Sequence, residues 1–168
     1  MEKKTKYIVH AAMIGALYVL LTYLQNLIFP DSASFFIQFR ASESLCVLAF
    51  FTPAAIPGLA VGCLLFNVSY AGALPLDFLV GTLATLLAAW GMRKTRNLTV
   101  RGVPLLGLLM PALTNAILVG WELDLYIGGG FWFNAVCVAI GEAAVLLTLG
   151  WALYSVLRKR KLYSALFG

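Results

Sequence analysis

Residues 41–70 read ASESLCVLAFFTPAAIPGLAVGCLLFNVSY, an apolar stretch with two prolines near its middle. Pro53 and Pro57 bracket three residues, and proline interrupts a helix because it lacks the amide N–H and clashes with the preceding turn. The stretch is therefore either one broken membrane span or two short spans joined by a tight turn. The charges on either side of it decide between these alternatives.

The rest of the chain is equally apolar. Of its 168 residues, 62% are hydrophobic and 11% are charged, whereas soluble domains carry about 25% charged residues. A spanning helix needs about 20 mostly apolar residues, within a range of about 17 to 25. No linker or low-complexity segment divides the chain, so we predict one transmembrane domain over residues 1–168. Its candidate spans are residues 7–29, 41–52, 56–70, 76–92, 103–120 and 131–157.

Basic residues set the topology, because cytoplasmic loops carry an excess of Lys and Arg. Three clusters hold eleven of the twelve Lys and Arg residues. With six spans all three clusters fall on one side of the membrane, whereas with five the middle cluster falls opposite the first. The sequence therefore predicts an all-α bundle of six transmembrane helices with both termini cytoplasmic. The clusters are Lys3, Lys4 and Lys6; Arg93, Lys94, Arg96 and Arg101; and Arg158, Lys159, Arg160 and Lys161.

Several other classes of protein fit poorly. The net charge of +5 lies in short clusters between apolar runs, which argues against nucleic-acid binding. Cys46, Cys63 and Cys137 lack disulfide or metal-site spacing and are expected to be small buried residues. The first apolar run is about twice as long as a signal-peptide core, so we expect a spanning helix. With one histidine, no HExxH and no phosphate-loop motif, the chain is predicted to have no catalytic site, metal or cofactor.

Polar side chains within the spans concentrate in the half opposite the basic clusters, as a cavity open to the outside would require. An ionisable group at membrane depth costs about 2.5 to 3.5 kcal/mol, so it faces the bundle interior, a partner or water. Glu43 and Glu142 are the most informative, and Glu142 has no basic residue three or four positions away. Asp31 and Asp124 are expected on the same outer side. The candidate substrate-binding residues are Arg40, Glu43, Asn67, Asp77, Asn115, Trp121, Glu122, Trp132, Asn134 and Glu142.

Structural roles remain open for several of these candidates. Asp77 follows Pro75 and could cap the N-terminus of its helix, where a carboxylate is favoured. Arg40 and Glu43 are three residues apart and could pair only with each other. Asn67 and Asn115 could hydrogen-bond across helices inside the bundle, as amides do in membrane proteins.

Aromatic and acidic residues meet in the predicted outer loop WELDLYIGGG, residues 121–130, which precedes Phe131, Trp132 and Phe133. Tryptophan and tyrosine gather at membrane interfaces without any further function. An aromatic ring beside a carboxylate is equally suited to stacking a flat, donor-rich heterocycle. The three glycines are expected to let the loop move as a lid.

Small residues mark the cytoplasmic half of the first span. Ala11 and Gly15 form one small-xxx-small pair, and Ala12 and Ala16 form another. Small residues let helices approach closely. They serve either packing within the bundle or docking of a separate membrane subunit.

Three motifs carry a resemblance to a known family. They are QFRASESL at residues 38–45, FTPAAIPGL at 51–59 with Gly62 and Cys63, and PLDF at 75–78 with GTLAT at 81–85. With these motifs the chain resembles the queuosine-precursor transporter family, QueT. The resemblance runs across nearly the whole length and is firmest over residues 38–85. The C-terminal third matches mainly in hydropathy and in Glu142.

The resemblance implies a six-helix substrate-binding S component of an energy-coupling factor (ECF) transporter. Such a protein takes up queuine, queuosine or a 7-deazaguanine precursor across a bacterial plasma membrane. It works with a shared transmembrane subunit and two ATPase subunits, in which ATP hydrolysis is expected. The pairs at residues 11–16 resemble the AxxxA motif that contacts the shared subunit. The alternatives are an S component for another vitamin, a stand-alone carrier and a structural membrane subunit that binds no solute.

Overall fold

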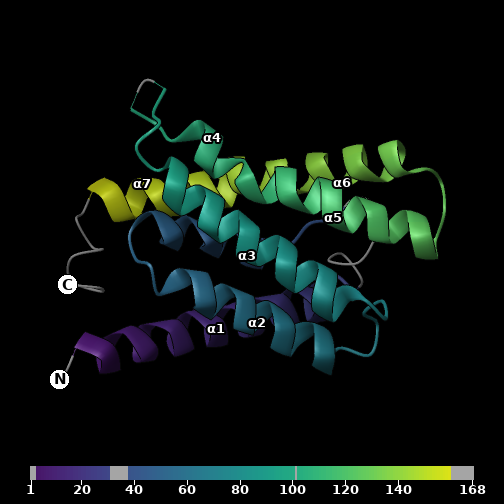
Figure 1. The fold of residues 1–168 in the computed structure, drawn as a ribbon, viewed down its shortest axis with the longest axis horizontal. Coiled ribbons are helices and arrows are strands. Elements are labelled where there is room, and N and C mark those ends of the chain that lie inside the picture. The colour runs from purple at the N-terminus through teal and green to yellow at the C-terminus, as the bar shows by residue number, and fades with distance from the viewer. Residues whose placement is uncertain (1–2, 31–37, 101, 160–168) are drawn as a thin grey trace.

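The computed structural model describes residues 3–30, 38–100 and 102–159, and this part of the chain is built from helices without a strand (Figure 1). Asp31, Arg101, Arg160 and Lys161, which the sequence analysis assigned to a membrane side, lie outside the described residues. η1 is a 3₁₀ helix and η2 is a π-helical turn. The elements are α1 (Lys3–Ile28), η1 (Ala41–Phe50), α2 (Ala55–Ser69), α3 (Asp77–Thr95), α4 (Leu105–Leu108), α5 (Met110–Tyr126), α6 (Phe131–Val145), η2 (Leu146–Gly150) and α7 (Trp151–Lys159).

α1, α2 and α5 run in one direction along the long axis of the molecule, and α3 and the continuous series α6, η2 and α7 run in the opposite direction (Figure 1). α1 packs on α2, α2 on α3, α3 on α5 and α5 on α6, so neighbours in sequence are mostly neighbours in space. η1 lies inside this arrangement and contacts α1, α2, α3, α6, η2 and α7. A short segment in contact with so many elements is well placed to carry functional side chains.

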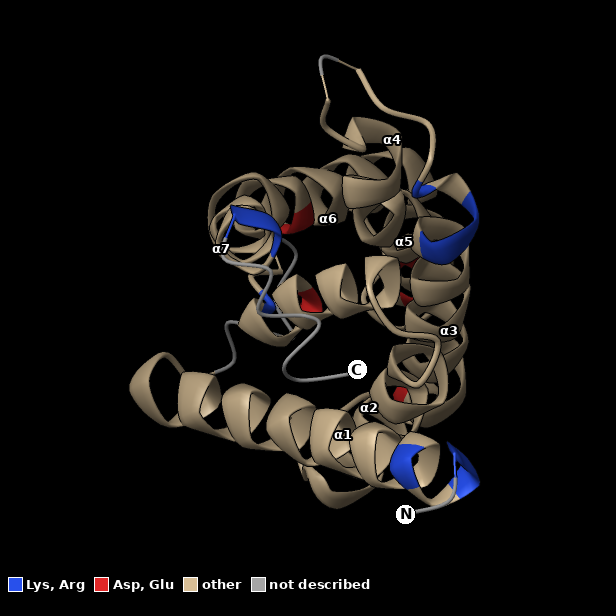
Figure 2. Ribbon diagram, turned by 90° about the vertical axis from the view of Figure 1, so that its left-hand side faces the viewer, with Lys and Arg blue, Asp and Glu red and all other residues tan. Residues whose placement is uncertain are grey.

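Basic residues gather at one end of the bundle, which we call the basic end. α1 begins there, and α3 and α7 end there (Figure 1). Figure 2 looks along the molecule from this end and shows Lys and Arg in blue on these segments. Arg93, in the last turn of α3, also donates to the carbonyl oxygens of Ala49 and Phe50 and so fastens the end of η1.

The 41–70 stretch forms two segments, η1 and α2, joined by a turn at residues 51–54. The Thr52 hydroxyl accepts a hydrogen bond from the Ala54 amide, and Pro57 lies in the first turn of α2, where proline is tolerated. A 3₁₀ helix rises about 2.0 Å per residue against about 1.5 Å in an α-helix. The ten residues of η1 therefore reach about as far as thirteen α-helical ones.

Glycines let α1 and α2 approach closely. A Cβ atom on Gly58 would lie 2.5 Å from the Ala11 carbonyl oxygen, and one on Gly62 would lie 2.7 Å from that of Gly15. Any larger residue at these positions would force the backbones apart. The first small-residue pair, Ala11 and Gly15, thus packs within the bundle.

The fifth predicted helix, 103–120, differs from the observed one. α4 covers only Leu105–Leu108, and α5 continues to Tyr126, so Trp121 and Glu122 lie in a helix and not in the predicted outer loop. The prediction ended the helix at Gly120, but that glycine serves packing: a Cβ there would lie 2.8 Å from the Cα of Ala135. The sixth predicted helix, 131–157, is observed as α6, η2 and α7 in succession.

The described surface is apolar and the interior carries charge, the reverse of a soluble domain. Large side chains such as Leu27, Val68 and Ile140 are exposed, whereas Glu43, Glu122 and Glu142 are fully buried. An apolar exterior of this extent suits a lipid environment. By length and composition, Lys3–Ile28, Leu105–Tyr126 and Phe131–Lys159 are able to cross a membrane.

Candidate functional site

Six buried side chains from five segments form what we call the polar cluster. Each is at most 5% exposed, although Arg40 and Glu142 are about 100 residues apart in sequence. Arg40 lies within electrostatic range of Glu43, Asp77, Glu122 and Glu142. The polar cluster consists of Arg40, Glu43, Asp77, Asn115, Glu122 and Glu142, all of them candidate substrate-binding residues from the sequence.

Arg40 is positioned by the backbone on both sides of it. The side-chain N–H of Gln25, on α1, donates to the Phe39 carbonyl, and its oxygen accepts from the Ala41 amide at 2.6 Å. The segment that leads into Arg40 also lies directly against α6, because a Cβ atom on Gly141 would overlap the carbonyl oxygen of Gln38. These contacts fix the backbone around Arg40 between α1 and α6, and its guanidinium reaches α3, where a Cβ atom on Gly81 would lie 3.7 Å from Nη1.

Glu43 is held by hydrogen bonds from three segments. Its Oε1 accepts from the Tyr18 hydroxyl at 2.6 Å and from the Thr85 hydroxyl at 3.2 Å, and its Oε2 accepts from the Cys46 thiol at 3.2 Å. A carboxylate with three donors is well compensated for its burial. Glu43 therefore joins α1, η1 and α3 into one unit.

Asp77 and Asn67 form a local junction between α2 and α3. The Asp77 carboxylate accepts from the Leu74 amide at 2.9 Å and closes the turn before α3. The Asn67 side chain donates to the Asp77 carbonyl oxygen at 2.7 Å, a hydrogen bond between the two helices. Asn67 thus has the interhelical role that the sequence left open for it, whereas Asp77 bonds to the turn before its helix and not to the helix N-terminus.

Three members of the polar cluster have no hydrogen-bond partner among the described residues. The members are Glu122, Glu142 and Asn115. Both carboxylate oxygens of each glutamate lack a partner within the described ranges, and so do the amide nitrogen and oxygen of Asn115. Glu122 lies next to Asp77, and Glu142 lies next to Asn115. Buried polar groups are nearly always hydrogen-bonded, and leaving one unmet costs about 1 to 3 kcal/mol. These unmet groups make the polar cluster the candidate site for a bound molecule.

The polar cluster also contains more carboxyl groups than basic groups. It contains four carboxylate side chains and one guanidinium, and Arg40 is the only Lys or Arg buried within the described part of the chain. Burying an unpaired charge is strongly unfavourable. A ligand that donates hydrogen bonds or carries positive charge would relieve this imbalance.

The remaining candidates lie at the edge of the polar cluster or outside it. Asn134 is buried, and its side-chain N–H donates to the Gly128 carbonyl at 2.9 Å, while its oxygen has no partner among the described residues. Trp121 and Trp132 are 49% and 79% exposed, so the structure does not bring them to the buried carboxylates. Stacking of a ligand on these rings stays a prediction.

The turn between α5 and α6 is set by its glycines. Gly128, Gly129 and Gly130 have φ angles of +80°, +91° and +94°, a region that favours glycine. The Asp124 carboxylate accepts from the Gly130 amide at 2.9 Å and ties the turn to α5. The turn therefore fixes how α6 returns along α5.

The sequence analysis missed one face of α1. Tyr18, Thr22 and Asn26 are buried polar residues spaced four apart, and Thr22 donates to the Ser42 hydroxyl at 2.8 Å. Residues four apart share one face of a helix. That spacing within an apolar helix was the available signal, and it points to the first turn of η1.

Within the described residues no three His, Cys, Asp or Glu side chains lie close enough together to hold a metal ion. An apolar helical exterior around a buried, incompletely bonded polar cluster is typical of a multi-pass membrane protein, and the polar cluster is its candidate small-molecule site. The profile of the QueT transporter family matches residues 8–159. The chain belongs to the QueT transporter family, as its motifs suggested, and is a membrane transport protein. No curated protein and no solved structure matches it.

Proposed function

We propose that the chain is the substrate-binding S component of an ECF importer and captures a queuosine precursor at the outer face of the bacterial plasma membrane. The precursor is queuine, queuosine or a 7-deazaguanine base. The observation that carries the proposal is the set of unpartnered buried groups on Asn115, Glu122 and Glu142. Membership of the QueT family supports transport and directs the choice of ligand.

The chemistry of a deazaguanine suits this site. Its pyrimidine edge presents two adjacent N–H donors, which one carboxylate accepts together, and a carbonyl that an amide or guanidinium donates to. Glu142 supplies the carboxylate, and the neighbouring Asn115 supplies the amide. The buried, low-dielectric position strengthens each of these hydrogen bonds.

The proposed topology has six spans with both termini in the cytoplasm. The described Lys and Arg residues outside the polar cluster lie toward the basic end of the bundle (Figure 2), which the positive-inside rule assigns to the cytoplasm. Asp77 at the start of α3 and Glu122 near the end of α5 lie toward the opposite end. The ligand therefore enters from outside.

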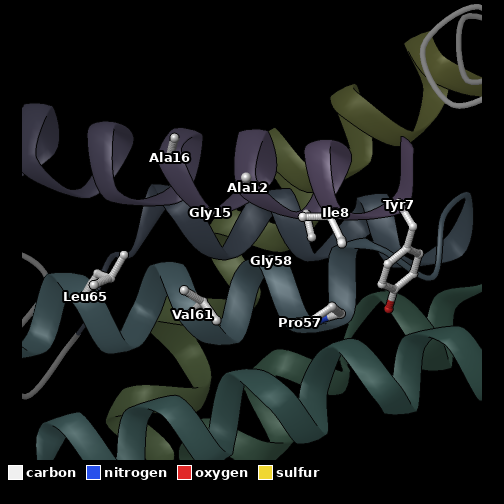
Figure 3. A pocket seen from close by; sticks show the side chains of 10 residues that line it. Tyr7, Ile8, Ala12, Gly15, Ala16, Pro57, Gly58, Val61 and Leu65 are labelled. Carbon is white, nitrogen blue, oxygen red and sulfur yellow. The ribbon is translucent and has the colours of Figure 1, made fainter. Parts of the chain in front are cut away.

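A groove between α1 and α2 is the proposed contact for the shared transmembrane subunit of the ECF complex. The groove has a volume of about 460 Å³, and Figure 3 shows Ala12 and Ala16 on one wall and Val61 and Leu65 on the other. Whereas Ala11 and Gly15 pack against α2, the second small-residue pair, Ala12 and Ala16, is exposed in this groove. The two ATPase subunits would join through that partner.

Ligand-dependent stability tests the substrate. The purified protein in detergent is melted with queuine, the aminomethyl and cyano 7-deazaguanines, guanine and a panel of vitamins, because a ligand bound to the folded state raises apparent stability. We expect a rise in melting temperature with deazaguanines alone. A rise with a vitamin instead, or with none of the compounds, would contradict the proposed substrate.

Association with partner subunits tests the groove. Ala16→Trp fills it and is expected to abolish co-purification with the transmembrane subunit while leaving the ligand-induced rise in melting temperature intact. Leu17→Trp is the matched control, since Leu17 is exposed on the same helix outside the groove. Equal loss in both variants would argue against the groove as the interface.

A further inference from the structure

A pocket at the basic end of the bundle lies apart from the polar cluster and from the groove between α1 and α2. It has a volume of about 460 Å³, and we call it the α7 pocket. We propose that it binds the phosphate headgroup of an anionic phospholipid in the cytoplasmic leaflet. The inference does not depend on the substrate of the protein. The α7 pocket is lined by residues 102 and 103 and by Trp151, Tyr154, Ser155, Arg158 and Lys159 of α7.

One face of α7 supplies the polar groups of the α7 pocket. Trp151, Ser155 and Lys159 follow one another at intervals of four residues, so they share a face of the helix, and Arg158 lies beside them. Phosphate oxygens accept hydrogen bonds from guanidinium, ammonium and hydroxyl groups, and charge strengthens such bonds. The three donors on this face therefore suit a phosphate, and the ring of Trp151 borders them with an apolar surface.

The wall opposite α7 is a well-defined turn. Val100 and Val103 exchange backbone hydrogen bonds of 2.8 and 3.1 Å, and Gly102 within the turn has a φ angle of +80°. Nη1 of Arg158 donates to the Gly102 carbonyl oxygen and, at 3.1 Å, to the Tyr154 hydroxyl. Within the described part of the chain, Nε and Nη2 of Arg158 make no hydrogen bond, so they are available to a ligand. The pocket is thus formed by the protein alone.

No carboxylate neutralises these cations in the described part of the chain. Its Asp and Glu residues belong to the polar cluster or, in the case of Asp124, to the turn at the opposite end of the bundle. Arg93, at the end of α3, instead donates to two backbone carbonyl groups of η1. Arg158 and Lys159 therefore place two positive charges at one pocket, which is complementary to an anionic headgroup.

The α7 pocket also lies where lipid headgroups are found. The basic end is the proposed cytoplasmic end, and the segment before α4 projects sideways from the bundle there (Figure 1). Leu98 and Val100 on that segment are 58% and 63% exposed, and Trp151 is 38% exposed. Apolar and tryptophan side chains favour the boundary between acyl chains and headgroups. Basic pockets between membrane helices on the cytoplasmic side bind lipid headgroups, and a free phosphate would gain nothing from this apolar rim.

Lipid titrations of the full chain purified in detergent test the inference. The probes are phosphatidylglycerol, which is anionic, and phosphatidylcholine with the same acyl chains, which is zwitterionic. We expect phosphatidylglycerol alone to raise the melting temperature. By native mass spectrometry, Lys159→Gln is expected to weaken phosphatidylglycerol binding about fivefold, the contribution of one basic residue near an anionic surface. Ser155→Phe, which fills the pocket without changing its charge, is expected to abolish most of the binding.

Lys94→Gln is the matched control. It removes the same charge at the same end of the bundle, from a side chain that lies over the Trp90 ring and outside the α7 pocket. We expect it to leave phosphatidylglycerol binding unchanged. Equal weakening by Lys94→Gln and Lys159→Gln would overturn the pocket in favour of a general attraction between the basic end and anionic lipid. A normal melting transition without lipid shows that each variant is folded.

The other outcomes concern the source of the phosphate. Stabilisation by glycerol phosphate at the concentration at which phosphatidylglycerol acts would overturn the lipid in favour of a soluble ligand. Equal stabilisation by the two lipids would overturn recognition of the headgroup charge. Either result leaves the melting response to deazaguanines, and hence the proposed function, unaffected.

Discussion

Glu43 and Glu142 are both fully buried carboxylates of one bundle, but they differ in the hydrogen bonds that they accept. Glu43, in η1, accepts hydrogen bonds from Tyr18, Thr85 and Cys46. Glu142, in α6, accepts none from the described residues. The protein completes the coordination of the first carboxylate and leaves that of the second open.

This difference divides the bundle into a scaffold and a receptive wall. The scaffold is α1, η1 and α3, where polar side chains hold one another, and the receptive wall is the buried face of α5 and α6. Unmet buried groups lower stability, which proteins tolerate where function requires it. Variants on the scaffold should therefore change folding, and variants on the receptive wall should change binding.

Gly141→Ala is expected to have the largest effect, because it acts where the scaffold meets the receptive wall. The added Cβ would overlap the Gln38 carbonyl oxygen and displace the segment that carries Arg40. Overpacking against backbone costs about 3 kcal/mol, so both the melting temperature and the affinity should fall. Ala143→Val, a change of similar size two residues along α6 at a partly buried site, is the control. A normal affinity in Gly141→Ala would show that this junction does not position the site.

Tyr18→Phe should mainly affect folding. It removes the 2.6 Å hydrogen bond to Glu43, and a bond to a charged group is worth about 2 kcal/mol. We expect a lower melting temperature of the ligand-free protein and less than a threefold change in dissociation constant for the folded fraction. Tyr23→Phe, which removes a hydroxyl at an exposed position of the same helix, is the control. Lost affinity at unchanged stability would move Tyr18 into the ligand site.

Asn115→Leu should raise the stability of the ligand-free protein, whereas Tyr18→Phe lowers it. Replacing an unpartnered buried amide by an apolar side chain of similar size removes a desolvation cost of about 1 to 2 kcal/mol, so the ligand-free protein should melt at a higher temperature. The same change should weaken ligand binding at least tenfold in a calorimetric titration. A lower melting temperature would mean that Asn115 belongs to the scaffold.

Asn67→Leu should have the smallest effect. Its side chain donates to the Asp77 carbonyl oxygen, and hydrogen bonds between membrane helices average about 0.6 kcal/mol. We expect a small fall in melting temperature and an unchanged dissociation constant. A tenfold loss of affinity would place Asn67 in the ligand site, for which the sequence analysis made it a candidate.

Composition and charge placement were enough to predict the all-helical fold and the inward-facing position of two carboxylates. An apolar run must form a helix in lipid, and a carboxylate within it must face inward, so Glu43 and Glu142 were found from sequence alone. The interruption at Pro53 was equally readable, because proline acts on its own chain neighbourhood.

Contacts between distant segments could not be predicted from the sequence. The Tyr18 to Glu43 hydrogen bond joins residues 25 positions apart, and nothing local to either residue specifies it. The 3₁₀ geometry of η1 depends on its many neighbours and not on its residue types. Glu122 was assigned to a loop because Gly120 looked like a helix end, although that glycine serves the close approach of α6.

At Gly128 the backbone φ angle, and not a lack of space, limits which residue fits the turn. A Cβ atom built on Gly128 meets nothing within 4 Å, yet its φ angle of +80° is one that L-amino acids adopt at a cost. A D-amino acid has the opposite preference, so it adopts a φ angle of +80° without strain. A chemically synthesised chain with D-alanine at this position would therefore keep the turn, whereas L-alanine would strain it.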